Sequence, residues 1–521
     1  MKFLFDDVHA GSYKPHEYEG YAKEVHPEQI LEALQDYRVC ESDQENYHVT
    51  WLEPFGGLLA LKQTLLLGIE HGNNKLLRLY LAESSGLFKL LAEQSWRKKV
   101  WPKFYWHVDD TCLRNALKNQ IKYWSLIPRQ QFTVSSRRFA IRDSRDKTVA
   151  RLILATVDGE GIPPFCQFKL ISLRGYEKKF DHIQALLEPW FFLKSYPATE
   201  LLQQELFNKE CVAKRPIDAK QPVLQALQAM LQEALDGLTI HYQGTLDDID
   251  TEFLHQYRVN VRKTRSLLKE FKKLLPVAEA KRFAGFFKTL NNITAPVRDL
   301  DVYLLKVEDW TEERGQTFRD QIKPFEQLLK RKRRVALRSM LDYLTSESYQ
   351  QELTAWKLFL DELGQTETSD QQTVQVFAAN LIAKCYKRLL KEGGGLTEAS
   401  PDAEYHELRL TFKRFRYILE FFNDLFAGKQ YKTLYKQAKR LQTLLGDFQD
   451  ITVQKSAVHD FAEELSGLKS VTHETFMALG QVSGEFVEQH DDLKHQFHLK
   501  FSEFSDEKHQ HMIANLKKAV L

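Results

Sequence analysis

Two stretches of the chain, residues 254–302 and 405–453, carry the same ionisable side chains at the same spacing, and a shift of 151 positions relates them without a gap. The shift places His255 on His406, Arg258 on Arg409, Arg265 on Arg416, Lys281 on Lys432, Lys288 on Lys439 and Asp299 on Asp450. A duplicated segment normally keeps its apolar periodicity while its surface charges diverge. Because these copies keep the same cations, the pattern indicates an anion-binding surface that is built twice.

Each copy reads as an amphipathic helix with two distinct faces. Apolar residues recur at spacings of three and four, which is the period of a helix face turned toward a core. These residues are Leu254, Tyr257, Val261, Thr264, Leu268 and Phe271 in the first copy, and Tyr405, Leu408, Phe412, Phe415, Leu419 and Phe422 in the second. Beside them runs a cationic stripe, made of His255, Arg258, Arg262, Arg265 and Lys269, and of His406, Arg409, Lys413 and Arg416. Like charges at this spacing repel by a few tenths of a kcal/mol each, so the stripe favours an anionic partner.

Internal carboxylates are the alternative partner for these cations, and Asp299, Asp301 and Asp450 are the candidates. The cations outnumber them locally, since residues 251–275 carry seven Lys or Arg against Glu252 and Glu270. Further basic runs occur at residues 330–338, 384–391 and 429–439. A single basic run most often forms a solvated face. The prediction of a binding surface therefore depends on the repeat-matched rows taken together.

These residues resemble the CHAD domain, the conserved-histidine α-helical domain. The resemblance covers residues 220 to about 515 and rests on "EFLHQYRVNVRKTRSLL" with "APVRDLDVYLLK", and on "YHELRLTFKRFRYILEFF" with "LQTLLGDFQDITV". It implies an all-α domain of two pseudo-symmetric four-helix bundles that binds inorganic polyphosphate in a basic groove. One departure between the copies is Arg298, which becomes Gln449 in the second.

The stripes and the resemblance together give the candidate polyphosphate-binding residues. They are His255, Arg258, Arg262, Lys263, Arg265, Lys269, Lys281, Lys288, Arg334, Lys384, Lys387, Arg388, His406, Arg409, Lys413, Arg414, Arg416, Lys432 and Lys439, with Asp299 and Asp450 as supporting acids.

The first 200 residues have a different sequence pattern. Apolar and polar residues often alternate with period two, which predicts a mostly antiparallel sheet or barrel. The segments "YHVTWLEPFGGLLALKQ" and "SSRRFAIRDSRDKTVARLILATVDG" resemble a divergent CYTH domain, the triphosphate-tunnel fold. Active CYTH members hold Mg²⁺ or Mn²⁺ with a Glu-x-Glu-x-Lys strand. Here Glu17 and Glu19 are followed by Tyr21 where that lysine belongs. We therefore expect a non-catalytic domain, in which Arg78, Arg138, Arg151 and Lys169 either line a tunnel or face solvent on the strands.

Composition limits the remaining classes of function. With 521 residues the chain is long for one core, and its formal net charge of only +2 means that anion binding must come from how the charge is distributed. The five cysteines lie far apart, which argues against a disulfide framework or a zinc site. Five histidines near the C-terminus, at His490, His495, His498, His509 and His511, lack ligand spacing and predict a solvated polar helix face. The N-terminus does not read as a secretory signal and no stretch reads as a membrane span.

The sequence thus predicts an α+β protein with a CYTH-like β-rich domain at residues 1–205, a linker at 206–222 and a CHAD domain at 223–515. The expected partner is inorganic polyphosphate, and no cofactor, resident metal or membrane is expected. A nucleic acid is disfavoured because the stripe lacks interleaved exposed aromatic residues. We expect a cytoplasmic location, with association with polyphosphate granules left open. The alternative function is a metal-dependent inorganic triphosphatase of the CYTH type.

Overall fold

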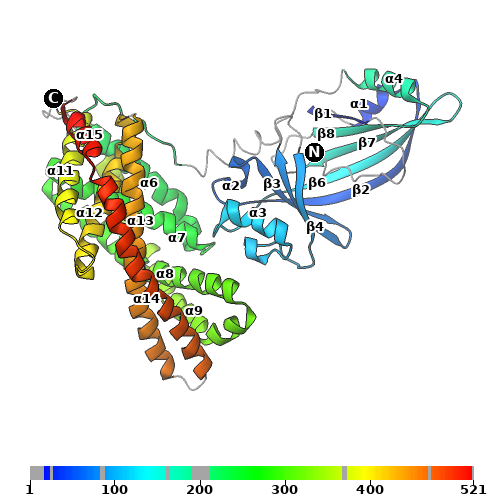
Figure 1. The fold of residues 1–521 in the computed structure, drawn as a ribbon. Coiled ribbons are helices and arrows are strands. Elements are labelled where there is room, and N and C mark those ends of the chain that lie inside the picture. The colour runs from blue at the N-terminus through cyan, green and yellow to red at the C-terminus, as the bar shows by residue number, and fades with distance from the viewer. Residues whose placement is uncertain are drawn as a thin grey trace. The chain divides into compact units, whose positions relative to one another are not determined.

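The structure is a computed structural model. It describes residues 17–23, 27–82, 88–159, 165–188, 212–365, 372–426, 428–467 and 471–518. The chain divides into two compact units, residues 1–211 and 212–521, and each is considered by itself below (Figure 1).

An antiparallel sheet of eight strands forms the first unit. The strands are β1 (Glu17–Lys23), β2 (Arg38–Glu53), β3 (Thr64–His71), β4 (Asn74–Ala82), β5 (Phe88–Ser95), β6 (Ile127–Arg142), β7 (Thr148–Asp158) and β8 (Phe165–Ser172). Their order in the sheet is β1-β8-β7-β6-β2-β3-β4-β5, so β1 and β5 are the edges among the strands described. The predicted antiparallel, barrel-like sheet is confirmed as a curled, open one.

Alternation along the strands divides the apolar residues of the sheet between its two faces. Leu152 and Leu170 point to the face covered by α1 (Pro27–Glu32) and α4 (Glu177–Leu187). Farther along, Leu66 of β3 and Leu77 and Leu79 of β4 pack under α2 (Leu58–Leu61), the short helix η2 (Tyr105–His107) and α3 (Thr111–Ile121). Ile153, next to Leu152 in the chain, belongs to a separate cluster with Trp51 and Leu67 on the opposite face.

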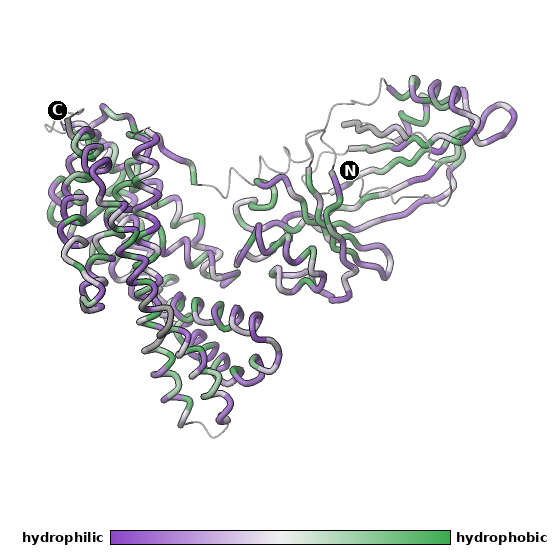
Figure 2. The backbone as a smooth tube through the Cα atoms, in the orientation of Figure 1, coloured by the Kyte–Doolittle hydropathy of each residue, from purple (hydrophilic) through white to green (hydrophobic). Residues whose placement is uncertain are grey.

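The second unit is entirely helical in its described elements, as predicted. Its first half holds α6 (Val223–Leu246), α7 (Thr251–Glu270), η4 (Lys272–Leu274), α8 (Val277–Arg314), α9 (Gln316–Leu344) and α10 (Glu347–Gln365). Its second half holds α11 (Val374–Gly394), α12 (Asp402–Phe421), η5 (Asn423–Leu425), α13 (Lys429–Ser466), α14 (His473–Phe504) and α15 (Glu507–Lys518). Figure 2 shows apolar and polar residues alternating along these helices, as amphipathic helices in a bundle require.

The two halves repeat one another helix by helix. The starts of α6 and α11 are 151 positions apart, and so are the starts of α7 and α12. The helices α8 and α13 are both 38 residues long. The internal repeat seen at residues 254–302 and 405–453 therefore extends back to the starts of α6 and α11.

The apolar cores are shared between the repeats rather than assigned one to each. The larger core joins α6, α7 and α10 of the first repeat to α11, α12 and α15 of the second, with Trp356 and Phe412 fully buried within it. A smaller core is made by the far parts of α8, α9, α13 and α14, which lie side by side at the lower end of this unit in Figure 1. Among the residues described, no helix is both long and apolar enough to cross a membrane.

A buried ion pair fastens α9 to α8. The Arg333 guanidinium binds Asp301 of α8 and also donates to Asp248, whose carboxylate lies 2.8 Å away in the α6–α7 turn. Burial raises the pKa of Asp301 to about 6 although Arg333 acts to lower it. Asp301 is thus the structural partner of one residue in the basic run 330–338, and the neighbouring Arg334 is exposed.

We predict that Arg333→Gln lowers the free energy of unfolding by about 3–5 kcal/mol, because it leaves the Asp301 charge buried without its partner. The matched control is Arg334→Gln, which makes the same chemical change one residue away and should cost less than about 0.5 kcal/mol. Urea unfolding of both variants measures the difference. Equal effects of the two changes would contradict the structural role given to Arg333.

Candidate anion-binding site

The helices α7 and α12 carry the two cationic stripes on a foundation of buried apolar side chains. Asp250 starts α7, because its carboxylate accepts hydrogen bonds from the amides of Glu252 and Phe253. The predicted apolar faces are confirmed, since Tyr257 and Val261 on α7 and Phe412 on α12 are fully buried in the shared core. The residues next to them in helical rotation are therefore held along the edge of that core.

Cations of both repeats meet around Lys413. This α12 side chain interacts electrostatically with Arg409 and Arg416 of its own helix and with Arg262 and Arg265 of α7. Burial and these four positive neighbours lower the pKa of Lys413 to about 8. We refer to Arg262, Arg265, Arg409, Lys413 and Arg416 as the cation cluster.

Ion pairs that cross between the repeats hold the two helices of the cluster together. Lys263 of α7 lies 3.1 Å from Glu420 of α12, and Arg414 of α12 donates two hydrogen bonds of 2.6 Å to Glu270 of α7. Lys263 and Arg414 are 151 positions apart, so each repeat contributes the equivalent cation to an ion pair with an acid of the other repeat. Their partners Glu420 and Glu270 do not share that spacing, and therefore the sequence repeat did not reveal these two ion pairs.

The remaining members of the stripes differ in how far they are paired. Arg258 is buried and donates to the Asn291 carbonyl at 2.8 Å and to the Thr294 hydroxyl at 2.6 Å. Burial is the main reason why its pKa falls to about 10. Arg416 binds Glu420 at 2.6 Å.

Four cations in the cluster have no such partner. Within the part of the chain that the structure describes, no carboxylate lies within ion-pairing distance of Arg262, Arg265, Arg409 or Lys413. The buried Nε groups of Arg258, Arg409 and Arg416 also lack hydrogen-bond acceptors among the described residues.

The two repeat-matched histidines have different neighbours. Burial, followed by the positive charges of Arg298, Arg262 and Arg258, lowers the pKa of His255 to about 4, so this ring is neutral near pH 7. In the second repeat the Nδ1 atom of His406 lies 2.6 Å from the amide oxygen of Gln449. Since Gln449 occupies the position of Arg298, that position faces the histidine in both repeats.

The proposed supporting acids lie close to the stripes without forming ion pairs in the described residues. Burial raises the pKa of Asp299 and of Asp450, while Arg258 and Arg409, respectively, act to lower them. The negative charge of Asp450 also contributes to the raised pKa of Asp299, so the acids of the two repeats lie within electrostatic range of each other. Lys306 of α8 interacts with Asp450 and was not recognised in the sequence, because the repeat does not conserve it.

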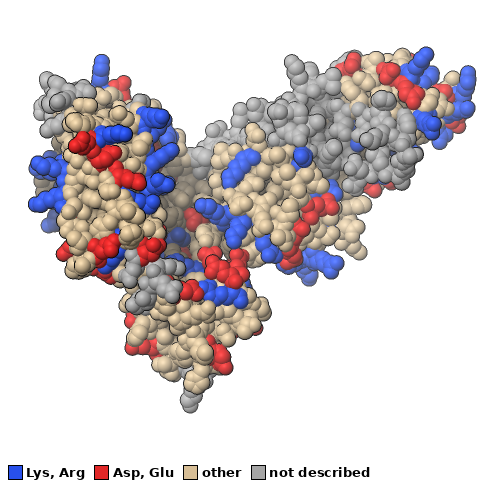
Figure 3. All heavy atoms as spheres, viewed as in Figure 1, with Lys and Arg blue, Asp and Glu red and all other residues tan. Residues whose placement is uncertain are grey.

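The other candidate cations are spread over the surface of the helical unit. Exposed side chains are found for Lys269, Lys281, Lys288, Arg334, Lys384, Lys387, Lys432 and Lys439. Arg388 is exposed and is bound by Glu392. Figure 3 shows Lys and Arg along both edges of the upper part of this unit, with acidic side chains between them. No interaction found in the described residues joins these cations to the cation cluster.

The C-terminal histidines are less solvated than the sequence predicted. His495 is exposed and pairs with Glu398, but His490 binds Asp402 at 3.0 Å and His498 lies 2.8 Å from the Tyr405 hydroxyl. These contacts attach α14 to the segment that starts α12. The simple prediction of a solvated face is thus wrong for His490 and His498, and also for His509, which is buried.

In the first unit, the strand register places Arg138, Arg151 and Lys169 on the face of the sheet that carries Ile153. Arg138 binds Asp43 at 3.3 Å and Glu45 at 2.9 Å, and Arg78 of β4 pairs with Glu93. The side chains of Glu17 and Glu19 lie outside the described residues, although their backbone forms β1. Among the side chains that are described, no group of three or more His, Cys, Asp or Glu is arranged to hold a metal ion.

Comparison with known families identifies the helical unit. Residues 229–459 match the sequence model of the CHAD domain, and this part of the chain is a CHAD domain. The comparison with curated proteins found no match.

Solved structures with similarity to the chain have low scores. A CHAD domain from the plant Ricinus communis is 22% identical, covering 56% of this chain and 94% of its own, with a TM-score of 0.47. The N-terminal part is similar to a structure from Hippeastrum, described as an adenylyl cyclase candidate with dominant triphosphatase activity, at 12% identity, 36% and 96% coverage and a TM-score of 0.24. A candidate adenylate cyclase from Bacillus halodurans is 15% identical, with 33% and 89% coverage and a TM-score of 0.21. Such similarities identify neither a ligand nor an activity.

We predict that Arg298→Gln raises the pKa of His255 above about 4, because Arg298 is the foremost of the positive charges that lower it. The value should stay below 6.5, since burial contributes more than any of these charges. Histidine NMR across a pH titration measures the shift, with Arg334→Gln as the control that should leave it unchanged. An unaltered pKa in Arg298→Gln would show that the two side chains do not interact.

Proposed function

We propose that the CHAD domain of this chain binds inorganic polyphosphate through the cation cluster and the stripes that flank it. One observation carries the proposal. Four cations from two repeats are fixed on one edge of the core, and no described carboxylate pairs with them. An isolated surface lysine would not support this interpretation, because solvent screens it.

A bound polyanion would relieve the repulsion among the cations of the cluster. Arg262 and Arg265 of one helix approach Lys413 of the other, and part of the energy of packing α7 against α12 offsets their mutual repulsion. A chain of phosphates places negative charge at regular intervals and can contact both stripes at once. Its oxygens would accept the hydrogen bonds that the guanidinium groups still have available. Association would also release counterions, which makes binding sensitive to salt.

The surroundings of the stripes favour polyphosphate over single-stranded nucleic acid. Nucleic acids of that kind bind by stacking their bases on exposed aromatic side chains. The aromatic residues of α7 and α12 beside the cations, including Tyr257, Phe412 and Phe415, are buried in the core. The stripes therefore offer charge without a stacking surface. In this proposal the first unit is a non-catalytic partner, and the protein acts in the cytoplasm.

The proposal predicts that polyphosphate binding weakens steeply with added salt and with loss of the unpaired cations. In Arg262→Gln/Lys413→Gln the affinity should fall at least tenfold, and the slope of log K against log salt should become shallower by roughly 1–2. Calorimetric titration of the full chain at several salt concentrations measures both quantities. The variant should be as stable as the parent or more so, because like charges have been removed.

A matched control makes the same change of net charge away from the cluster. Lys323→Gln/Lys357→Gln removes two exposed cations of α9 and α10 and should retain nearly full affinity. The proposal fails if both double variants lose the same affinity, since binding would then depend only on total charge. It also fails if DNA of matched charge binds as tightly as polyphosphate.

The cluster also predicts a pH dependence. Because the pKa of Lys413 lies at about 8, this side chain loses its proton as the pH rises from 7 to 9. The affinity for polyphosphate should therefore fall over that range, by roughly tenfold for the loss of one charged contact. Lys413→Arg keeps the charge at both pH values and should flatten the profile. If the parent and Lys413→Arg have the same profile, Lys413 is not a contact residue.

A further inference from the structure

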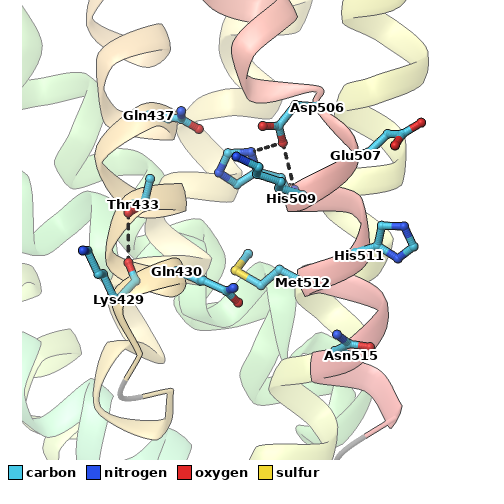
Figure 4. Close-up of a pocket in the computed structure, with 11 residues that line it drawn as sticks. Lys429, Gln430, Thr433, Gln437, Asp506, Glu507, His509, His511, Met512 and Asn515 are labelled. Carbon is cyan, nitrogen blue, oxygen red and sulfur yellow. Dashed lines mark hydrogen bonds and ion pairs between the residues drawn. The ribbon is translucent and has the colours of Figure 1, made fainter.

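The helical unit contains a pocket of about 650 Å³ that lies apart from the cation cluster, between α13 and α15 (Figure 4). The α13 side chains Lys429, Gln430, Thr433 and Gln437 form one wall. The α15 segment forms the other wall, with His509 and Met512 at its buried side. In Figure 4 the ring of His509 lies between the two helices and Gln437 faces it from α13.

The repeat shows which residues occupy the equivalent place in the first half of the domain. Gln437 is 151 positions after Phe286. The start of α15 corresponds to that of α10, because Asp506 accepts from the amide of His509 just as Ser346 accepts from the amide of Tyr349. His509 therefore takes the place of Tyr349.

In the first repeat this place is filled by packed aromatic rings. The rings of Phe286 and Tyr349 lie 6.1 Å apart, and both residues are buried. Tyr349 also stacks on Tyr242, and its hydroxyl lies 3.1 Å from that of Tyr257. The space is thus closed by ring contacts and a satisfied hydroxyl pair.

In the second repeat the same two positions are polar and the space is open. Nδ1 of His509 interacts with Asp506, while its Nε2 has no hydrogen-bond partner among the described residues. The side-chain oxygen of Gln437 is buried and likewise without a donor in the described part of the chain. Leaving such an acceptor unsatisfied is costly, and an aromatic pair would have avoided that cost, as it does in the first repeat.

We propose that this pocket binds a small phosphorylated polyol, a sugar phosphate or a nucleoside monophosphate. A ligand hydroxyl would donate to the Gln437 oxygen, and a second polar group would meet Nε2 of His509. Lys429 lines the end of the pocket where α13 begins with the positive end of its dipole (Figure 4), and this lysine would hold the phosphate. Asp506 and Glu507 line the opposite end of the pocket, beside the start of α15 (Figure 4), and oppose a long polyanion, which separates this ligand from polyphosphate.

The test titrates the full chain with glucose 6-phosphate and with adenosine monophosphate. Comparing the two shows whether the pocket prefers a sugar phosphate or a nucleoside monophosphate. Inorganic phosphate and glucose are the controls, because they carry the phosphate alone and the sugar alone. At least one of the two organic phosphates should bind at least tenfold more tightly than inorganic phosphate. The pocket assignment is overturned if neither does, because the site would then hold only water or a stray anion.

Two variants locate the binding. Gln437→Phe/His509→Tyr restores the residues of the first repeat, and Gln437→Leu removes only the unsatisfied amide should the double change fail to fold. Each should lower the affinity for the organic phosphate at least tenfold and leave the melting temperature equal or higher. Unchanged affinity in a folded variant would refute the assignment.

Separate variants test polyphosphate binding at the cation cluster and organic phosphate binding in the pocket. Arg262→Gln/Lys413→Gln should lose polyphosphate and retain the organic phosphate, whereas Gln437→Leu should do the reverse. If the cluster variant also loses the organic phosphate, that ligand binds at the cation cluster and the pocket has no role.

Discussion

Repulsion among the cations around Lys413 is the constraint on which the helical unit depends. Five positive side chains from two repeats approach one another where burial already penalises charge. Two features hold them there, namely the apolar core beneath α7 and α12 and the crossed ion pairs of Lys263 and Arg414 with acids of the other repeat. The cation cluster therefore retains unpaired charge, and in the proposed function this charge attracts the anion.

Duplication gave the domain two cationic stripes, which meet in one cluster around Lys413, and divergence at a few positions made the two repeats different. Arg298 adds to the effect of burial in lowering the pKa of His255, whereas Gln449 in the equivalent place hydrogen-bonds His406. Phe286 closes the first half with aromatic packing, whereas Gln437 helps to open a pocket in the second. Both changes keep the helices in place and alter only what lies between them. The fold therefore tolerates a change of chemistry at positions that face an edge or a cavity.

The sequence was sufficient for features that follow from local periodicity. Spacings of three and four predicted the buried faces of α7 and α12, and period-two alternation predicted strands such as β4 and β6. Contacts between distant residues were not predictable in this way. Glu270 and Glu420 do not share the 151-residue spacing, Arg333 finds Asp301 across two helices, and His490 binds Asp402 far along the chain. Each depends on how helices pack, which no single-helix pattern encodes.

In the proposed function, Lys413 would couple anion binding to the stability of the fold. Its pKa is about 8 in the folded chain against 10.5 for an ordinary lysine, so between these values the unfolded chain binds the proton more tightly. The contribution of this residue therefore makes folding more favourable as the pH rises through that window and less favourable below it. In the proposed function, a bound anion would favour the charged lysine and raise its pKa again, which would remove the penalty at neutral pH. The free energy gained by relieving this repulsion would be part of the affinity of the anion, and the anion would stabilise the folded state by mass action in proportion to that affinity.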